Sequence, residues 1–259
     1  MIKRMKHFFV GIFTLFFFFL NSLHATQEPP QPAPLPLRIA VDTFTPPFIM
    51  EGANSQLYGF DISMMKYICQ EIQRTCVFVP TEFNNIFTSL ERGQVDAAVS
   101  ALTITPERSA RVLFSMPYLL SHSRFIGLNQ LADQPFTLQL LHNKTIGIEE
   151  GTIFPAVINA LGIRDPKIIS FNDAPSLIDA LQAGKVEIVL MDNPSAMYWQ
   201  AQSSGRLKVL GQPFSYGFGL GIAVNRNNAE LLNQINQALI KFQNSNAFKR
   251  EFNKYIAFF

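Results

Sequence analysis

Short apolar runs alternate with amphipathic stretches along most of this chain, and this alternation restricts the possible folds more than any other feature. Leu37–Val41 and 186–190 have the length and apolar character of buried strands. Between such runs, segments such as 62–73 and 173–183 carry apolar residues close to helical spacing. Chains in which strands and helices alternate in this way form α/β proteins. The sequence therefore predicts an α/β fold.

The same patterns predict the bounds of individual elements. Strands are expected at 37–41, 77–80, 96–102, 125–128, 144–149 and 186–190, with a strand-like return over 214–224. Helices are expected at 62–73, 83–90, 173–183, 231–242 and 247–255, and two more begin near 103 and 153. Asp61 is expected to cap the first of these helices.

One polar corner, within 96–118, follows a predicted buried strand. In Thr103-Ile104-Thr105-Pro106-Glu107-Arg108, hydroxyl residues precede a proline in the first helical turn. Backbone N–H groups at a helix start attract anions, and the forked guanidinium of Arg108 fits a carboxylate through two parallel hydrogen bonds. The alternative is an ordinary helix cap followed by a solvated charge. The corner is therefore a candidate carboxylate site.

Polar residues also follow three other predicted strands, at the strand ends where open α/β sheets bind ligands. Asp42 and Phe44 follow the first strand, and Phe44 could instead be packed inside the protein. Glu149 ends an apolar strand, where a solvated carboxylate is the ordinary interpretation. Gly151 then permits a close backbone approach before a helix start. Asp192 precedes a proline-initiated helix, which it could simply cap.

The first 25 residues differ from the rest of the chain. Lys3, Arg4 and Lys6 precede an almost wholly apolar run over 8–20, and Leu23-His24-Ala25 suits a signal peptidase. The run is short for the ~20 residues of a membrane-spanning helix, which argues against a retained anchor. We therefore expect export to the periplasm, with cleavage after about Ala25. Residues 26–36 are expected to form an extended, Pro-rich leader.

Loss of the signal changes the net charge. The full chain has 21 Lys and Arg against 19 Asp and Glu, so removal of three basic residues leaves −1. A near-neutral chain without a Lys/Arg block gives no electrostatic case for nucleic-acid binding. The sequence also shows no nucleophile triad, phosphate loop or metal-ligand cluster. We therefore expect neither a metal nor a cofactor.

The two cysteines, Cys69 and Cys76, are separated by Gln-Glu-Ile-Gln-Arg-Thr. In a reducing compartment they would be buried thiols, but an even count in an exported chain favours a disulfide. Such a bridge would close a short loop and stabilise the fold by ~2 to 3 kcal/mol. A metal site is disfavoured because the pair lacks close spacing and a nearby histidine.

Three motifs together resemble the signature of periplasmic solute-binding proteins for polar amino acids, family 3, which serve ABC importers. They are Asp96-Ala97-x-x-Ser100, Thr103-Ile104-Thr105-x-x-Arg108 and Phe114-Ser115-x-Pro117-Tyr118. The resemblance runs from Arg38 to the end of the chain. It implies the type II fold of that family, in which two lobes, each a mixed sheet flanked by helices, are joined by two crossovers. The expected lobes are 37–121 plus 216–259, and 122–215.

The resemblance also implies ligand contacts. Positions matching Arg108, assisted by Ser100 and Thr103, hold the α-carboxylate, and Ala101 lies in the same loop. The turn of Gly151, Thr152 and Ile153 serves the same carboxylate, although Ile153 replaces a threonine and offers only its backbone N–H. The position matching Asp192 receives the α-ammonium group.

The ligand side chain is expected among Asp42, Phe44, Phe83 and Glu149. Thr45 stands where binders of basic amino acids usually have tyrosine, so Phe44 would have to substitute. A subset of the family, binders of basic amino acids, carries a disulfide at the place of Cys69 and Cys76.

We therefore expect a monomeric periplasmic binding protein, not an enzyme, that delivers a polar L-amino acid to an inner-membrane ABC permease. Arginine, lysine, ornithine or histidine is favoured over glutamine, which remains the alternative within the family. Outside that function, the sequence also admits a cyclohexadienyl dehydratase-like enzyme on the same fold, with Glu149 as its acid or base, or a sensor module that acts through a partner.

Overall fold

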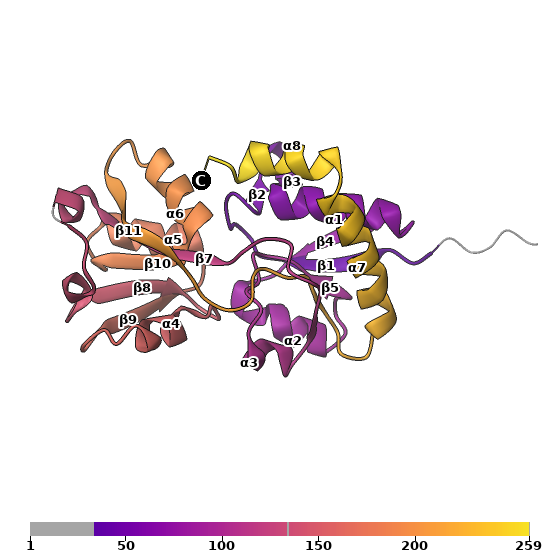
Figure 1. Ribbon diagram of the computed structural model, residues 1–259, viewed down its shortest axis with the longest axis horizontal. Helices are drawn as coiled ribbons and strands as arrows, with labels where there is room; N and C mark the ends of the chain where they lie inside the picture. The colour runs from indigo at the N-terminus through magenta and orange to yellow at the C-terminus, as the bar shows by residue number, and fades with distance from the viewer. Residues whose placement is uncertain (1–33, 134, 259) are drawn as a thin grey trace, which may run out of the picture. The chain divides into compact units, whose positions relative to one another are not determined.

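The computed structural model describes residues 34–133 and 135–258 of the protein. These residues form two β-sheets, each flanked by helices (Figure 1). The predicted signal peptide and residues 26–33 of the predicted leader lie outside the described residues. Within the described ranges, none of the helices has the length and apolar character needed to cross a membrane. We call the elements around the first sheet lobe 1 and those around the second sheet lobe 2.

The sheet of lobe 1 has the strand order β4-β1-β5-β12-β6. Its strands are β1 (Leu37–Val41), β4 (Cys76–Pro80), β5 (Ala97–Ala98), β6 (Leu113–Phe114) and β12 (Ala223–Val224). Strand β1 runs parallel to both β4 and β5, whereas β12 is antiparallel to β5 and β6. A small hairpin, β2 (Met50–Glu51) with β3 (Leu57–Tyr58), lies beside this sheet. The C-terminal strand β12 thus completes a sheet begun by the N-terminal part of the chain.

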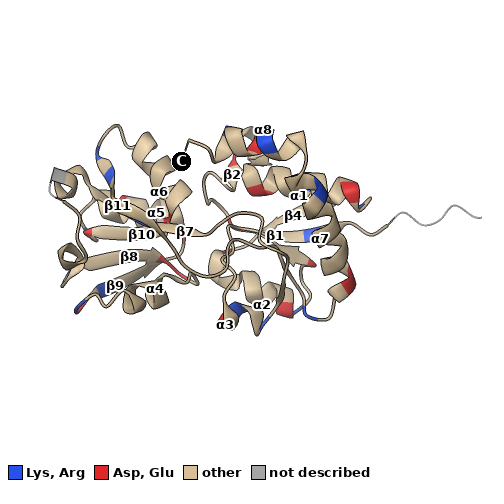
Figure 2. Ribbon diagram, in the orientation of Figure 1, with Lys and Arg blue, Asp and Glu red and all other residues tan. Residues whose placement is uncertain are grey.

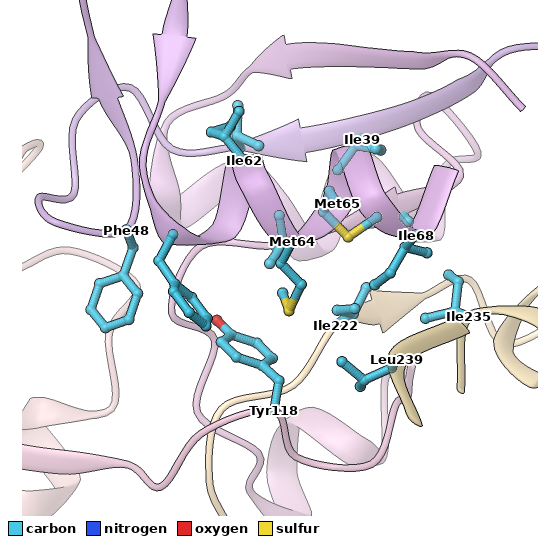
Figure 3. Close-up of a cluster of buried hydrophobic side chains, with 14 of the residues drawn as sticks. Ile39, Phe48, Ile62, Met64, Met65, Ile68, Tyr118, Ile222, Ile235 and Leu239 are labelled. Atoms are coloured by element: carbon cyan, nitrogen blue, oxygen red, sulfur yellow. The ribbon is translucent and has the colours of Figure 1, made fainter. Parts of the chain in front are cut away.

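Helices cover both faces of this sheet (Figure 1). One face packs against α1 (Phe60–Glu71), α7 (Ala229–Gln243) and α8 (Asn246–Tyr255), and the other against α2 (Ile86–Glu91). In Figure 3, Met64 and Ile68 of α1 point toward Ile222 and Leu239 from the C-terminal part of the chain. Burying these side chains against each other holds the discontinuous lobe together. The predicted disulfide between Cys69 and Cys76 is formed and links α1 to β4.

The sheet of lobe 2 has the order β11-β7-β10-β8-β9. Its strands are β7 (His122–Leu128), β8 (Thr145–Glu149), β9 (Lys167–Phe171), β10 (Ile188–Asp192) and β11 (Leu207–Ser215). Strand β8 is parallel to β9 and β10, and β7 is antiparallel to β10 and β11. Its helices are α4 (Phe154–Ala160), α5 (Ala174–Gln182) and α6 (Asn193–Gln202). Both sheets are therefore mixed, as the resemblance implied.

Two chain segments connect the lobes, one between β6 and β7 and one between β11 and β12 (Figure 1). They are bridged to each other at Leu119 and Leu220, and Leu220 is also bridged to Thr103. Gly217 in the second segment has φ +74°, and a Cβ there would lie 2.5 Å from Thr103 Cγ2. The second crossover therefore passes directly beside the polar corner predicted from the sequence.

Three sequence expectations about the elements are wrong. The strand predicted over 96–102 is only Ala97–Ala98, because Ala101 adopts a left-handed backbone with φ +46° that ends the extended run. Asp61 does not precede α1 but lies inside its first turn, where its carboxylate accepts from the backbone N–H of Ala101. The return predicted over 214–224 is split between β11 and β12. In addition, the strands β2, β3, β6 and β9 were not predicted.

Candidate functional site

A cavity lies between the two lobes and is lined by the ends of several strands and helices. Its volume is about 30 Å³, and Arg108 of lobe 1 donates across it to Gly151 O of lobe 2. Nine residues predicted from the sequence line it: Thr45, Phe83, Ala101, Thr103, Arg108, Glu149, Thr152, Ile153 and Asp192. The lobes are therefore closed over this point.

Arg108 projects from the one-turn helix α3 (Pro106–Ser109), and Thr105 caps that helix by accepting from the Arg108 backbone N–H at 3.3 Å. The side chain is 8% exposed. Nη1 donates to Thr103 O at 3.0 Å, and Nη2 donates across the cavity to Gly151 O at 3.1 Å. Because α3 has a single turn, the guanidinium carries the anion-binding capacity here rather than a long helix dipole.

Two aromatic rings pack against the guanidinium of Arg108. Its Cζ atom lies 5.6 Å from the centre of the Phe83 ring and 5.0 Å from that of Phe87. Cation–π contacts of this kind stabilise a cation that has left water. Burial lowers the pKa of Arg108 to about 10, and the nearby negative charge of Asp192 opposes that shift. The group therefore remains protonated at neutral pH.

Glu149 lines the cavity, and Asp42 is buried behind Thr45, which also lines it. Asp42 in the loop after β1 is 1% exposed, and Glu149 at the end of β8 is 8% exposed. Figure 2 shows acidic residues at the end of β8 that faces lobe 1. Burial, then the charges of Asp42, Asp192 and Asp173, raise the pKa of Glu149 to about 9. Burial likewise raises the pKa of Asp42.

These two carboxyl groups are incompletely paired. Asp42 accepts from the hydroxyl of Thr45, and its backbone N–H donates to Ser100 Oγ at 3.2 Å. Nevertheless, Asp42 Oδ1 and Glu149 Oε1 are buried with no hydrogen-bond partner among the described residues. Buried polar atoms are nearly always paired in folded proteins, so this part of the cavity favours a ligand that donates hydrogen bonds.

Asp192 ends β10 and precedes α6, but its side chain makes no capping hydrogen bond within the described chain. Burial raises the pKa of Asp192 to about 7, while the positive charge of Arg108 acts to lower it. The two groups attract each other without forming an ion pair in the part of the chain that the structure describes. A positive and a negative group held apart in one cavity can bind the two charged ends of a zwitterion.

Asp61 positions a loop that lines the cavity. Its carboxylate Oδ2 accepts from Ala101 N at 2.9 Å and from the Tyr118 hydroxyl at 3.1 Å. Ala101 has a backbone conformation that residues other than glycine seldom adopt, and such residues are often found at binding sites. The buried Asp61 therefore fixes the loop that carries Ala101 and Thr103 toward the cavity.

Gly151 of lobe 2 lies against lobe 1. Its φ is +80°, and a Cβ at this position would be 2.6 Å from the Cα atom of Asn84 in lobe 1. The close backbone approach predicted for Gly151 is therefore made to the other lobe. The neighbouring Thr152 hydroxyl donates to Glu149 O at 2.6 Å, within its own turn.

Three predicted residues are outside the cavity lining, besides Gly151. Phe44 packs edge-on against Trp199, with ring centres 6.1 Å apart. Ser100 is fully buried, and its hydroxyl accepts from the Asp42 backbone rather than facing the cavity. Asp42 itself lies behind Thr45, which lines the cavity.

Ser195 lines the cavity and was not predicted. It is 5% exposed, and its Oγ atom has no hydrogen-bond partner among the described residues. It lies three residues after Asp192, on the same face of the helical turn, and this spacing is the signal that could have identified it. Trp199 continues that face, and its buried Nε1 atom is likewise unpaired among the described residues.

A family model for bacterial extracellular solute-binding proteins, family 3, matches residues 37–258. The chain belongs to this family. As a family 3 solute-binding protein, it is similar to ABC transporter arginine-binding protein 1 of Escherichia coli (strain K12). The two are 30% identical over 217 residues, or 83% of this chain and 88% of that protein. The lysine/arginine/ornithine-binding periplasmic protein of the same strain is 27% identical over 238 residues, 87% of this chain and 89% of its own.

Solved structures show the same likeness. An arginine 3rd transport system periplasmic binding protein from Legionella pneumophila has a TM-score of 0.80 and 30% identity. That match covers 86% of this chain and all of the other. An ancestral arginine-binding protein bound to arginine has a TM-score of 0.78 and 27% identity, covering 85% and 98% of the two chains. The predicted family and its α/β fold with mixed sheets are confirmed.

Proposed function

We propose that this protein is the periplasmic substrate-binding component of an ABC importer and that it binds a basic L-amino acid between its lobes. The observation that carries this proposal is the pair of buried, incompletely paired carboxyl groups of Asp42 and Glu149. A guanidinium or ammonium group would donate hydrogen bonds to them and neutralise their charge. A neutral side chain would supply fewer donors and no charge.

The two backbone charges of the amino acid have matching groups on opposite lobes. Arg108 of lobe 1 would bind the α-carboxylate, exchanging its bonds to Thr103 O and Gly151 O for stronger bonds to a charged acceptor. Asp192 of lobe 2 would receive the α-ammonium group. Binding would then join the lobes through the ligand, which is how a ligand shifts a two-lobe protein toward its closed form.

Entry of an amino acid requires the lobes to separate, because Arg108 of lobe 1 donates across the cavity to Gly151 O of lobe 2. The crossovers between β6 and β7 and between β11 and β12 would act as the hinge, with lobes of 37–121 plus 216–259 and 122–215. We propose that the closed form docks on an inner-membrane permease as a monomer after export to the periplasm. Relatives named for periplasmic binding support this location.

The names of the relatives favour arginine and other basic amino acids. Glutamine remains the alternative, since an ancestral arginine-binding protein has also been solved bound to glutamine. The acidic cavity argues for the cation, because two buried carboxyl groups attract a positive side chain much more strongly than an amide.

A dehydratase is the second candidate function. One solved relative is the ancestral amino acid-binding protein described as a precursor of cyclohexadienyl dehydratase, at 26% identity and a TM-score of 0.76. A buried Glu149 that holds its proton at neutral pH could act as a general acid. However, Arg108 is the one basic residue among the described residues lining the cavity, and several carboxyl groups would repel a substrate with two carboxylates. Incubation with prephenate or arogenate and a search for product test this alternative.

Thermal unfolding tests the binding function directly. The protein, purified from the periplasm and dialysed, is melted with each of the twenty common amino acids and with ornithine. A ligand at ~100 times its dissociation constant adds ~2.7 kcal/mol to the free energy of unfolding, which raises the melting temperature clearly. We expect arginine, lysine, ornithine or histidine to give the largest shift. A shift with glutamine alone would refute the basic ligand, and no shift with any would refute amino-acid binding.

A further inference from the structure

One aromatic contact joins the two lobes outside the cavity. Phe44, in the loop after β1, belongs to lobe 1, whereas Trp199, on α6, belongs to lobe 2. Their ring centres are 6.1 Å apart with an interplanar angle of 61°, an edge-on geometry that aromatic pairs favour. Neither residue lines the cavity. The contact therefore exists only while the lobes are together, and neither ring has to touch the ligand to make it.

The neighbouring packing fixes both rings at the junction of the lobes. Phe44 packs against the core of lobe 1, and Trp199 packs against the core of lobe 2. Tyr198, also on α6, packs against the core of lobe 1, although its helix belongs to lobe 2. The rings of Tyr198 and Trp199 meet edge-on, with centres 5.5 Å apart. Both aromatic residues of this helix thus take part in the contact between the lobes.

We propose that Phe44 and Trp199 form a closure latch, a contact that stabilises the closed form over the open form and so raises the affinity for the ligand. Separating the lobes would expose more of both half-buried rings to water. A ligand that binds the closed form gains from every contact that only this form makes. Phe44 and Trp199 are therefore positioning residues rather than the ligand contact expected for Phe44. This inference rests on the proposed function, because it requires a ligand that closes the lobes.

The geometry of the pair sets the expected size of the effect. An edge-on aromatic pair shifts an equilibrium by about 2-fold to about 12-fold beyond the effect of burying its area. Phe44→Leu keeps an apolar side chain in the loop but removes the ring, so the dissociation constant for arginine should rise by about this factor. The rise should come from faster dissociation, because the ligand leaves only when the lobes separate.

A double-mutant cycle distinguishes a latch from two independent ligand contacts. The parent, Phe44→Leu, Trp199→Leu and the double variant are purified from the periplasm and titrated with arginine by calorimetry. Radiolabelled arginine, chased with an excess of unlabelled arginine, reports the dissociation rate. We expect the double variant to lose little more affinity than the more affected single variant, because each single change already breaks the contact. Losses that multiply in the double variant would show that the two rings act separately, which would overturn the inference.

Phe248→Leu is the matched control. Phe248 is half-buried like Phe44, but its ring contacts lie within lobe 1, with Phe60, Phe242 and Phe252. This variant should bind and release arginine as the parent does, and thermal unfolding without ligand checks that each variant is folded. If Phe248→Leu loses as much affinity as Phe44→Leu, the effect is a general loss of packing and the latch is wrong.

Tryptophan fluorescence gives a second test that needs no variant. Trp199 is the single tryptophan of the 259 residues, so its emission, excited beyond the tyrosine absorption band, reports on the latch alone. Closure covers the indole with Phe44, so saturating arginine should shift the emission to shorter wavelength. An unchanged spectrum, while calorimetry records arginine binding, would overturn the latch and leave the proposed function intact. Absence of arginine binding by the parent would refute the proposed function and the latch with it.

Discussion

Replacing Arg108 with alanine removes the one guanidinium that the described chain places in the cavity. The change deletes the hydrogen bonds to Thr103 O and Gly151 O and the contacts with Phe83 and Phe87. If the ligand carboxylate binds here, the variant must leave that carboxylate buried beside Asp192 and Glu149 without a counter-charge. The Arg108→Ala substitution should therefore mainly weaken ligand binding.

The magnitude follows from the burial of the side chain, which is 8% exposed. Truncating one partner of a buried, hydrogen-bonded charge pair costs about 2 to 5 kcal/mol. This range corresponds to a dissociation constant about 30-fold to about 4,000-fold larger. Arg108→Lys keeps the charge but loses the fork that fits both carboxylate oxygens, so its affinity should lie between that of the parent and that of Arg108→Ala.

Titration calorimetry with arginine measures these affinities, and thermal unfolding without ligand checks that each variant is folded. Arg111→Ala is the matched control, since this arginine lies three residues further along, pairs with Glu91 at 2.7 Å and is 47% exposed in its side chain. We expect the control to bind arginine within a few-fold of the parent. An Arg108→Ala variant that also binds within a few-fold of the parent would show that Arg108 is not the carboxylate clamp.

Two further predictions concern closure and pH. Gly151→Ala would place a Cβ 2.6 Å from Asn84 Cα, so we expect about 1 to 3 kcal/mol of overpacking and an arginine affinity reduced about 5- to 150-fold. The control is Gly162→Ala, because Gly162 has a similar φ but open space around it, and equal affinities in the two variants would contradict this prediction. The pKa values of Glu149, Asp192 and Asp61 are raised by burial to about 9, 7 and 7, so the folded protein binds more protons than the unfolded chain between about pH 4 and 9. The free energy of unfolding without ligand should then fall as the pH rises through this window, and a melting temperature higher at pH 8 than at pH 5 would refute it.

The sequence was sufficient for features that depend on neighbouring residues. The hydrophobic pattern located β1 and α7 closely, because β1 is a short apolar run buried on both faces and α7 buries one regular apolar face. The start of α3 was also predicted from its threonine and proline residues, and Thr105 does cap this helix. The pairing of Cys69 with Cys76 was predicted from an even count in a chain expected to be exported, and the bridge is present. Each of these features depends on local chemistry or on a simple count.

Features that depend on distant parts of the chain could not be predicted this way. The left-handed Ala101 is held by Asp61, forty residues earlier, and no local pattern reports such a bond. Strand β9 has exposed and partly buried positions but no buried one, because it lies at the sheet edge. The gathering of Arg108, Glu149 and Asp192 around one cavity likewise exists only after the two lobes fold and meet. The individual site residues were therefore easier to predict than their arrangement.

The distribution of charge over the lobes explains why closure should depend on the ligand. Lobe 1 contributes Arg108 and Asp42 to the cavity region, and lobe 2 contributes Glu149 and Asp192. Closing the lobes without a ligand brings more buried negative than positive charge together, which is unfavourable unless Glu149 keeps a proton. A basic amino acid supplies two positive groups and one negative group, so it corrects this imbalance only in the closed form. A ligand shifts a conformational equilibrium by its differential affinity for the two states, and here that difference lies in the carboxyl groups that closure brings together.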